Sequence, residues 1–216
     1  MDIFNSLEMF YKNTCKKTIE DSSDIVECIS KDLNIDLEYF SSGSSIILME
    51  HEDKETLLCV TFDKRKRISY EAVGVKTFNF KSSSRSALLD TFELFLVEKL
   101  DKFNLYESNN IEEFKIFESA CDIYESMFSA HVTSPLDSSE LCFDFESNIE
   151  LILEDYQIYA NEEEIELYEK YLSTIESSVL SISRALPGEA VNIDLSEKQF
   201  VYKGSQLICI DPLYFI

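Results

Sequence analysis

The sequence predicts an α+β protein, and three observations support this class. Apolar residues recur at helical spacing near the start of the chain and over long stretches of its second half. Runs rich in β-forming residues, bounded by turn signals, occupy the segment between them and the tail. The 216 residues are 45% hydrophobic with only four glycines and three prolines, which is enough for a core and leaves little room for low-complexity linkers.

In the first third of the chain, helical spacing over residues 2–39 predicts two short helices. The sequence Ser-Ser-Gly-Ser-Ser at 41–45 is a turn signal. The β-rich runs that follow at 46–50 and 56–62 predict a hairpin around the polar connector HEDKE. The positive cluster DKRKR at 63–67 is expected to lie in an exposed loop.

The middle of the chain is expected to begin with an extended run at 68–80. The pattern SSSRSALLDTFELFLVEKL at 82–100 predicts a helix with serine caps and an apolar face, and a further helix is expected at 111–129. The segment TSPLDSSE at 133–140 combines Pro and Ser between two strongly patterned regions, which is typical of a boundary.

A long helix is predicted at 161–186, because Asn161 is a suitable cap and three glutamates follow it in the first turn, where the helix dipole favours negative charge. Pro187-Gly188 ends this helix. Two short β-rich runs, 200–202 and 207–210, then predict a terminal hairpin.

Charge excludes some classes of partner. The chain has 42 acidic and 19 basic residues and a formal net charge of −23, which repels nucleic acid and anionic lipid. We expect no direct binding to nucleic acid and no membrane association. The same field attracts proteins with a basic surface.

Six cysteines occur without any CxxC pair, and Cys59 and Cys209 lie inside apolar runs, so we expect reduced core residues. No basic leader precedes an apolar stretch at the N-terminus, and no apolar run is long enough to span a bilayer. These features predict a cytoplasmic protein.

The tail reads IDLSEKQFVYKGSQLICIDPLYFI. It resembles a segment of the protein-kinase-like phosphotransferases of bacteria and their phages, which has the form D-L-H-x-x-N, a strand, a glycine turn, a second strand and D-P. The matching positions are Asp194-Leu195-Ser196, Gln199, Gly204 and Asp211-Pro212.

The resemblance implies a bilobal fold with a small N-terminal lobe that contains the β-hairpin (1–106) and a mainly helical C-terminal lobe that ends in a β-hairpin (107–216). It also implies that Asp194 is the catalytic base, that Gln199 and Asp211 hold a metal, and that ATP and Mg²⁺ are the cofactors if the site is functional.

Departures from the family pattern favour a pseudokinase with no cofactor. Ser196 replaces the usual His, and Gln199 is one methylene longer than Asn, which misplaces an oxygen that Mg²⁺ needs held tightly. The hairpin at 46–62 resembles the opening of the small lobe, yet its lysine position is Cys59. Only Gly43 lies near enough to serve a phosphate-binding loop.

A second alignment remains open for the phosphate-pairing lysine. Lys76, in Gly-Val-Lys, would take the lysine position and Glu93, 17 residues on, would be its helix partner. This version leaves the hairpin after 41–45 unexplained.

Acidic residues dominate the segment 144–169, which has no basic residue. On a helix, glutamates four residues apart lie on one side and repel each other unless a basic partner neutralises them. Their spacing of about 6 Å is also close to that of phosphates along one strand. The expected partner-binding face comprises Glu146, Glu150, Glu154, Glu162, Glu163 and Glu166.

Three functions follow from these observations. The first is a catalytically impaired kinase-like protein of phage or mobile-element type that binds a protein and regulates or inhibits host machinery. The second is an acidic DNA mimic that inhibits a nucleic-acid-binding protein, and the third is an active serine/threonine kinase with substituted motifs.

Overall fold

The computed structural model confirms the α+β class, and it describes residues 2–15, 21–43, 45–82, 86–107, 110–131, 142–189 and 191–215. The chain divides into two compact units. The first comprises 1–67 and 75–99, and the second comprises 68–74 and 100–216. The change from first to second unit at Lys99 comes before the expected division at 106/107. The boundary expected at 133–140 lies outside the described residues.

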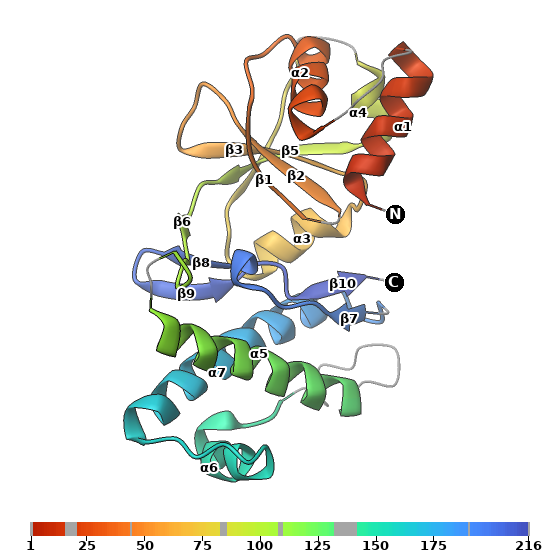
Figure 1. Ribbon diagram of the computed structural model, residues 1–216. Helices are drawn as coiled ribbons and strands as arrows, with labels where there is room; N and C mark the ends of the chain where they lie inside the picture. The colour runs from red at the N-terminus through yellow and green to blue at the C-terminus, as the bar shows by residue number, and fades with distance from the viewer. Residues whose placement is uncertain are drawn as a thin grey trace. The chain divides into compact units, whose positions relative to one another are not determined.

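An antiparallel five-stranded sheet forms the centre of the first unit (Figure 1). Its order is β1 (Glu38–Ser42), β2 (Ile46–Glu50), β3 (Thr56–Thr61), β5 (Glu93–Glu98) and β4 (Thr77–Asn79). The hairpin expected at 46–62 is confirmed as β2 and β3, with Ile47 opposite Val60. The turn signal at 41–45 joins β1 to β2.

Three helices pack against this sheet: α1 (Ile3–Cys15), α2 (Ser22–Leu33) and α4 (Ala87–Thr91). The first two confirm the helices expected within 2–39. Asp21 begins α2, because its carboxylate accepts hydrogen bonds from the backbone N–H groups of Ser23 and Asp24 at 2.8 and 3.1 Å. The apolar faces of α1 and α2 share one core with Met49, Leu58 and other residues on the same side of the sheet.

The helix expected at 82–100 is wrong. Of the described residues in this range, Ala87–Thr91 alone is helical, and Glu93–Glu98 forms β5, which pairs with β3 on one side and β4 on the other. Phe95 and Val97 are buried on one face, while Leu94 and Leu96 pack on the core of the other face. A strand covered on both faces reads as a continuous apolar run, which periodicity does not separate from a helix.

The basic cluster at 63–67 is not an exposed loop, and the run at 68–80 is extended only over β4. Residues Arg65–Ala72 form α3. Arg65 pairs with Asp63 at 2.8 Å, and Lys66 is only 4% exposed. Burial opposes ionisation of Asp63, but hydrogen bonds from Arg65 outweigh it and hold the pKa of this carboxyl below its ordinary value.

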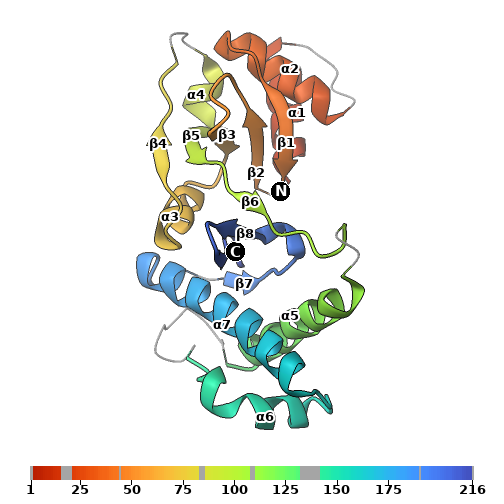
Figure 2. The ribbon, with the colours of Figure 1, turned by 90° about the vertical axis from the view of Figure 1, so that its left-hand side faces the viewer.

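Helices form most of the second unit: α5 (Ile111–His131), α6 (Phe145–Asp155) and α7 (Glu162–Ala185), with α7 packed beside α5 and α6 (Figure 2). The helices expected at 111–129 and 161–186 are confirmed. Asn161 caps α7 as expected, in a reciprocal pair with Glu164 whose hydrogen bonds are 3.0 and 2.8 Å long.

Two small sheets complete this unit. The expected terminal hairpin is confirmed as β8 (Phe200–Lys203) and β9 (Gln206–Cys209), and β6 (Asp101–Lys102) adds a third strand. The other sheet pairs β7 (Val191–Ile193) with β10 (Leu213–Phe215). Cys59 and Cys209 are both fully buried, and neither forms a disulfide with another described residue, which confirms them as core residues.

No helix in the described ranges combines the length and apolar character needed to cross a bilayer.

Candidate functional site

The kinase-like tail motif lies on the two connections between the small sheets of the second unit, from β7 to β8 and from β9 to β10. Asp194 follows β7, and its backbone N–H donates to the carbonyl of Pro212 at 3.0 Å. Asp211 precedes Pro212, so the sheet brings the two aspartates of the motif close together along the backbone. Asp194 is exposed and Asp211 is half-buried.

Gln199 belongs to a short 3-10 turn, η1 (Glu197–Gln199), which begins after Ser196. The Gln199 side-chain oxygen accepts a hydrogen bond from the Ser196 backbone N–H at 2.6 Å, and the Ser196 side chain accepts from the Gln199 N–H. This reciprocal pair is a capping box. The longer glutamine side chain therefore folds back to cap its own turn.

This geometry does not fit the metal that the family motif implies. A metal ligand needs its oxygen directed at the ion, and octahedral Mg²⁺ tolerates little displacement. The Gln199 oxygen is instead directed at the backbone of Ser196. Within the described part of the chain, no three or more His, Cys, Asp or Glu side chains are arranged to hold a metal ion.

Glu125 on α5 is a neighbour of the motif that the sequence did not predict. Its carboxylate accepts a hydrogen bond from the Leu195 backbone N–H at 3.2 Å. Burial raises the pKa of Glu125, with Asp122 and Asp194 adding to the rise and the Leu195 hydrogen bond opposing it. The loop that carries Asp194 is thus held by a carboxylate that its own charge repels.

We predict that Asp194→Asn lowers the pKa of Glu125, because one of the charges that disfavour the ionised form is removed. A raised pKa in the folded protein means that stability is fully present below the ordinary value of 4.5 and is lost as the pH rises through the raised value. The variant should lose less stability over that rise. Carbon-13 NMR titration of the Glu125 carboxyl measures the shift. Asp101→Asn, at an exposed position on β6, should leave it unchanged, and an unchanged pKa in Asp194→Asn would contradict the placement of Asp194.

Glu197 is a second anchor that the sequence did not reveal. Its carboxylate accepts hydrogen bonds from the backbone N–H groups of Leu105 and Tyr106, the latter at 3.0 Å. These partners lie 92 and 91 residues away in sequence, so no local pattern could predict them. Glu197 thus holds the turn at 196–199 to the segment at 105–106, and Gln199 caps the turn itself.

In the first unit, the lysine position of the expected hairpin is a core position. Cys59 lies in β3 between Leu48 of β2 and Phe95 of β5, and it is fully buried. Gly43 lies in the turn between β1 and β2, where its N–H donates to the Ile46 carbonyl at 2.9 Å. A Cβ at this position would make only an ordinary contact with Ile46, so the turn does not require glycine.

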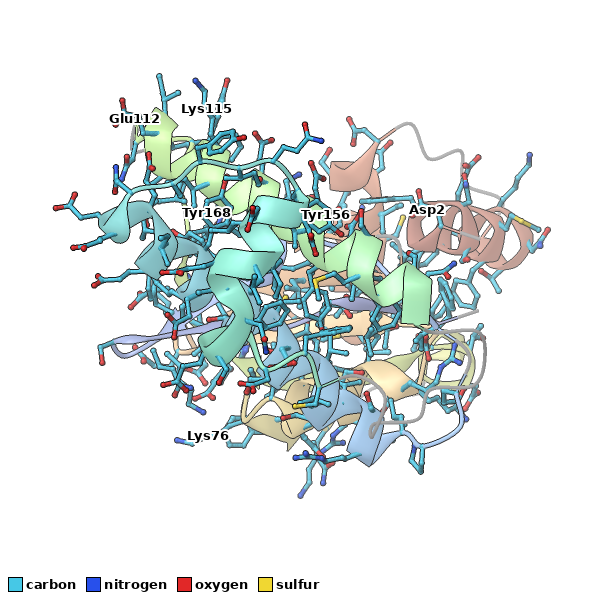
Figure 3. The ribbon with its side chains drawn as sticks, turned by 90° about the horizontal axis from the view of Figure 1, so that it is seen from below. Asp2, Lys76, Glu112, Lys115, Tyr156 and Tyr168 are labelled. Carbon is cyan, nitrogen blue, oxygen red and sulfur yellow. The ribbon has the colours of Figure 1, made fainter. Side chains whose placement is uncertain are left out.

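The alternative pair of Lys76 and Glu93 is not formed. Lys76 is exposed, extends away from the ribbon (Figure 3), and donates its backbone N–H to Glu98 at 2.7 Å. Glu93 is on a strand rather than a helix and lies opposite Thr61, at the other end of β5. Five residues of strand separate Glu93 from Glu98, or roughly 17 Å, which is too far for an ion pair with Lys76.

The six glutamates of the expected acidic face are all exposed. Glu146, Glu150 and Glu154 follow one side of α6, and the others lie in the first two turns of α7, which packs against α6. Among the residues that the structure describes, none of the six takes part in an ion pair. Apolar side chains are exposed in the same region, with Leu151 at 62% and Tyr159 at 96%.

Comparisons with known proteins give one distant structural likeness. The sequence matches no protein-family model and no curated protein. The solved streptomycin-ATP-APH(2")-IIa ternary complex is similar at 16% identity over 92% of this chain and 73% of that chain, with a TM-score of 0.28. A likeness at this level assigns neither a family nor an activity. The class that the observed sheets and cores define is an α+β protein of two units.

Proposed function

We propose that this chain is a kinase-related binding protein without phosphotransfer activity, which takes a protein partner with a basic surface on the acidic face of α6 and α7. The observation that carries the proposal is the hydrogen bond from the Ser196 N–H to Gln199 at 2.6 Å, which uses the expected metal ligand as a cap.

The order of elements supports the kinship. Protein kinases carry their phosphate-pairing lysine on the third strand of the small lobe and its glutamate partner on the following helix. Here β3 is the third strand of the sheet and α3 is the following helix, with Glu71 as its sole acidic residue. The expected lysine position on β3 is the buried Cys59, which supplies no cation to pair with phosphate.

The acidic face supports protein binding as the function of a chain that lacks phosphotransfer activity. Glutamates on one side of a helix repel each other, and the described residues offer these six no internal cation to relieve the repulsion. Exposed apolar side chains such as Tyr159 among them supply contact area that charge alone does not. A basic partner would relieve the repulsion between the glutamates and would cover the exposed apolar side chains.

The first prediction from this proposal is that ATP with Mg²⁺ leaves the thermal unfolding of the protein unchanged. A nucleotide present at a hundred times its Kd would stabilise the folded state by about 2.7 kcal/mol, which thermal-shift titration readily detects. Stabilisation that disappears in Asp211→Ala, together with labelling of a substrate from radioactive ATP, would instead establish an active kinase.

The binding surface is tested by neutralising Glu162, Glu163 and Glu166 to Gln and comparing capture of a basic partner from host lysate. A matched control removes three other exposed carboxylates: Glu55→Gln, Asp90→Asn and Asp101→Asn. Loss of the partner in the first variant alone supports this face. Equal loss in both would assign the binding to net charge.

The DNA mimic remains a second candidate because Glu146, Glu150 and Glu154 are exposed along one side of α6 at intervals of about 6 Å. A mimic should displace DNA from a basic host protein, and its affinity should fall steeply with salt. Binding that is independent of salt would exclude this candidate.

A further inference from the structure

A groove of the first unit lies beside α2 and β1, and none of the residues discussed above as a kinase-like position lines it. It has a volume of about 840 Å³. Helix α2 contributes Ser23, Val26, Glu27, Ser30 and Lys31, whose spacing of three and four places them on one side of the helix. From Ser23 to Lys31 this side is roughly 12 Å long, at 1.5 Å per residue.

The floor of the groove is apolar. Val26 and Leu37 are 5% and 7% exposed, and Ile35 and Phe80 are half-buried beside them. Tyr39, on β1, is 46% exposed and lies on the face of the sheet that α2 covers, because it pairs with Met49 in the core of that face. The groove therefore offers two aromatic rings, those of Tyr39 and Phe80, and several aliphatic side chains to an occupant.

The rim of the groove is negative. Asp36, Glu38 and Glu52 are exposed carboxylates that form no ion pair with other residues in the described part of the chain. Lys31 contributes the opposite charge, but it is paired with Glu27 on the same helix. The three carboxylates therefore remain without a cation, which selects a basic occupant over an acidic one.

An extended chain fits this shape better than a compact ligand. Strand β1 is at the edge of the five-stranded sheet, and edge strands accept the main chain of an added peptide. Side chains of an extended peptide alternate between two sides, so apolar residues can lie on the floor while basic residues reach the rim. A length of roughly 12 Å accommodates three to four extended residues at about 3.3 Å each.

We propose that the groove between α2 and β1 binds an extended peptide segment in which basic and apolar residues alternate. This inference rests on the proposed function, since it gives the basic protein partner a second contact, in the first unit. The segment belongs to the partner and reaches a surface distinct from the acidic face of α6 and α7.

The probe is a fluorescent, end-capped hexapeptide of alternating lysine and leucine, and binding is measured by anisotropy with the full chain. We expect the triple variant Asp36→Lys, Glu38→Lys and Glu52→Lys to bind at least about tenfold more weakly, because the rim then repels the peptide. Asp90→Lys, Asp101→Lys and Glu118→Lys, at exposed positions outside the groove and the acidic face, change the net charge by the same amount and should bind nearly as well as the natural chain. Equal weakening in both variants would show attraction by net charge only and would overturn the groove.

A second pair of variants separates packing from charge. Tyr39→Ala should weaken the peptide several-fold, and the loss should persist at high salt, where exposed charges are screened. Tyr106→Ala removes a more exposed tyrosine (71%) in the second unit, outside both proposed binding surfaces, and should have no effect. An unchanged affinity in Tyr39→Ala, with the fold verified by circular dichroism, would also overturn the proposal.

The outcomes distinguish this inference from the proposed function. If the probe does not bind but a basic partner is still lost on neutralising Glu162, Glu163 and Glu166, the groove is excluded and the acidic face stands. If the probe binds in the groove and neutralising the acidic face has no effect on partner capture, the groove stands and the proposed face is excluded.

Discussion

Replacing Phe117 by alanine is expected to lower the free energy of unfolding by about 3–5 kcal/mol, the range for large aromatic residues in a core. Phe117 is 2% exposed on α5. Its ring contacts those of Phe103, Tyr171 and Phe200 at centroid distances of 5.2, 5.3 and 4.8 Å, two of them edge-on. The ring thus joins α5 to α7 and to β8, the first strand of the tail motif.

Urea unfolding followed by far-ultraviolet circular dichroism measures this effect, with the midpoint and slope fitted for each variant. The matched control is Ile111→Ala on the same helix, where the side chain is 62% exposed and the change should be within about 0.5 kcal/mol. A loss in Phe117→Ala no larger than in the control would contradict the aromatic core of the second unit.

Elements with local signals were predictable from the sequence. The helix α7 has an asparagine cap, three glutamates in its first turn and a proline after its end, and each signal acts within a few residues. The hairpins β2–β3 and β8–β9 likewise consist of short β-rich runs on either side of polar turns. In these segments local propensity and tertiary packing favour the same structure, so a single sequence was sufficient.

Segments governed by tertiary contacts were not predictable. The run that forms β5 is apolar at every position from Leu94 to Val97, because both faces are covered and two strands flank it. In α3, Arg65 and Arg67 bond with Asp63, Thr77 and Asn79. A basic cluster whose sequence suggests full exposure to solvent is therefore partly bound within the protein. Neither arrangement leaves a periodic signal.

The spacing of the residues in the candidate site was predictable from the sequence, but the contacts of their side chains were not. The positions of Asp194 and Asp211 were read from the spacing of the tail motif, and the Asp194–Pro212 hydrogen bond shows that the pairing of β7 with β10, which was not expected, brings their backbones together. The sequence did not indicate that the Gln199 oxygen accepts from Ser196, or that Glu125 and Glu197 hold the surrounding loops. The last two contacts join residues at least 70 positions apart, and side-chain direction is decided by such partners rather than by spacing.

The groove beside α2 illustrates the same limit. Its helical side repeats at three and four residues, which the sequence suggests, but the pattern alone does not distinguish a buried stripe from a groove wall. The positions of β1 and of the connection at 34–37 determine that Val26 lies on the floor of the groove and that Asp36 lies on its rim. A surface site whose residues come from several elements therefore leaves no recognisable pattern in the sequence of any one element.

Introducing lysine at Cys59 is expected to destabilise the first unit by at least about 3 kcal/mol, since it places an unpaired ammonium in a fully desolvated position. The variant should gain no affinity for ATP with Mg²⁺, because the position is enclosed by Leu48 and Phe95 on the adjacent strands. Urea unfolding measures the first effect, and nucleotide titration of the folded fraction measures the second. If the lysine instead left stability unchanged and created nucleotide binding, Cys59 would face a phosphate site rather than the core.

Two further measurements keep this test decisive if the lysine variant unfolds. Cys59→Val, which keeps an apolar side chain of similar size, should cost less than about 1.5 kcal/mol. Hydrogen exchange of the lysine variant should show lost protection in the strands of the first unit while α5 and α7 of the second unit stay protected, because Cys59 and the strands that pair with β3 all belong to the first unit. Loss of protection in both units would mean that they unfold together. Retained protection in β3 would mean that the ammonium is accommodated, and would contradict the enclosure of position 59 by the adjacent strands.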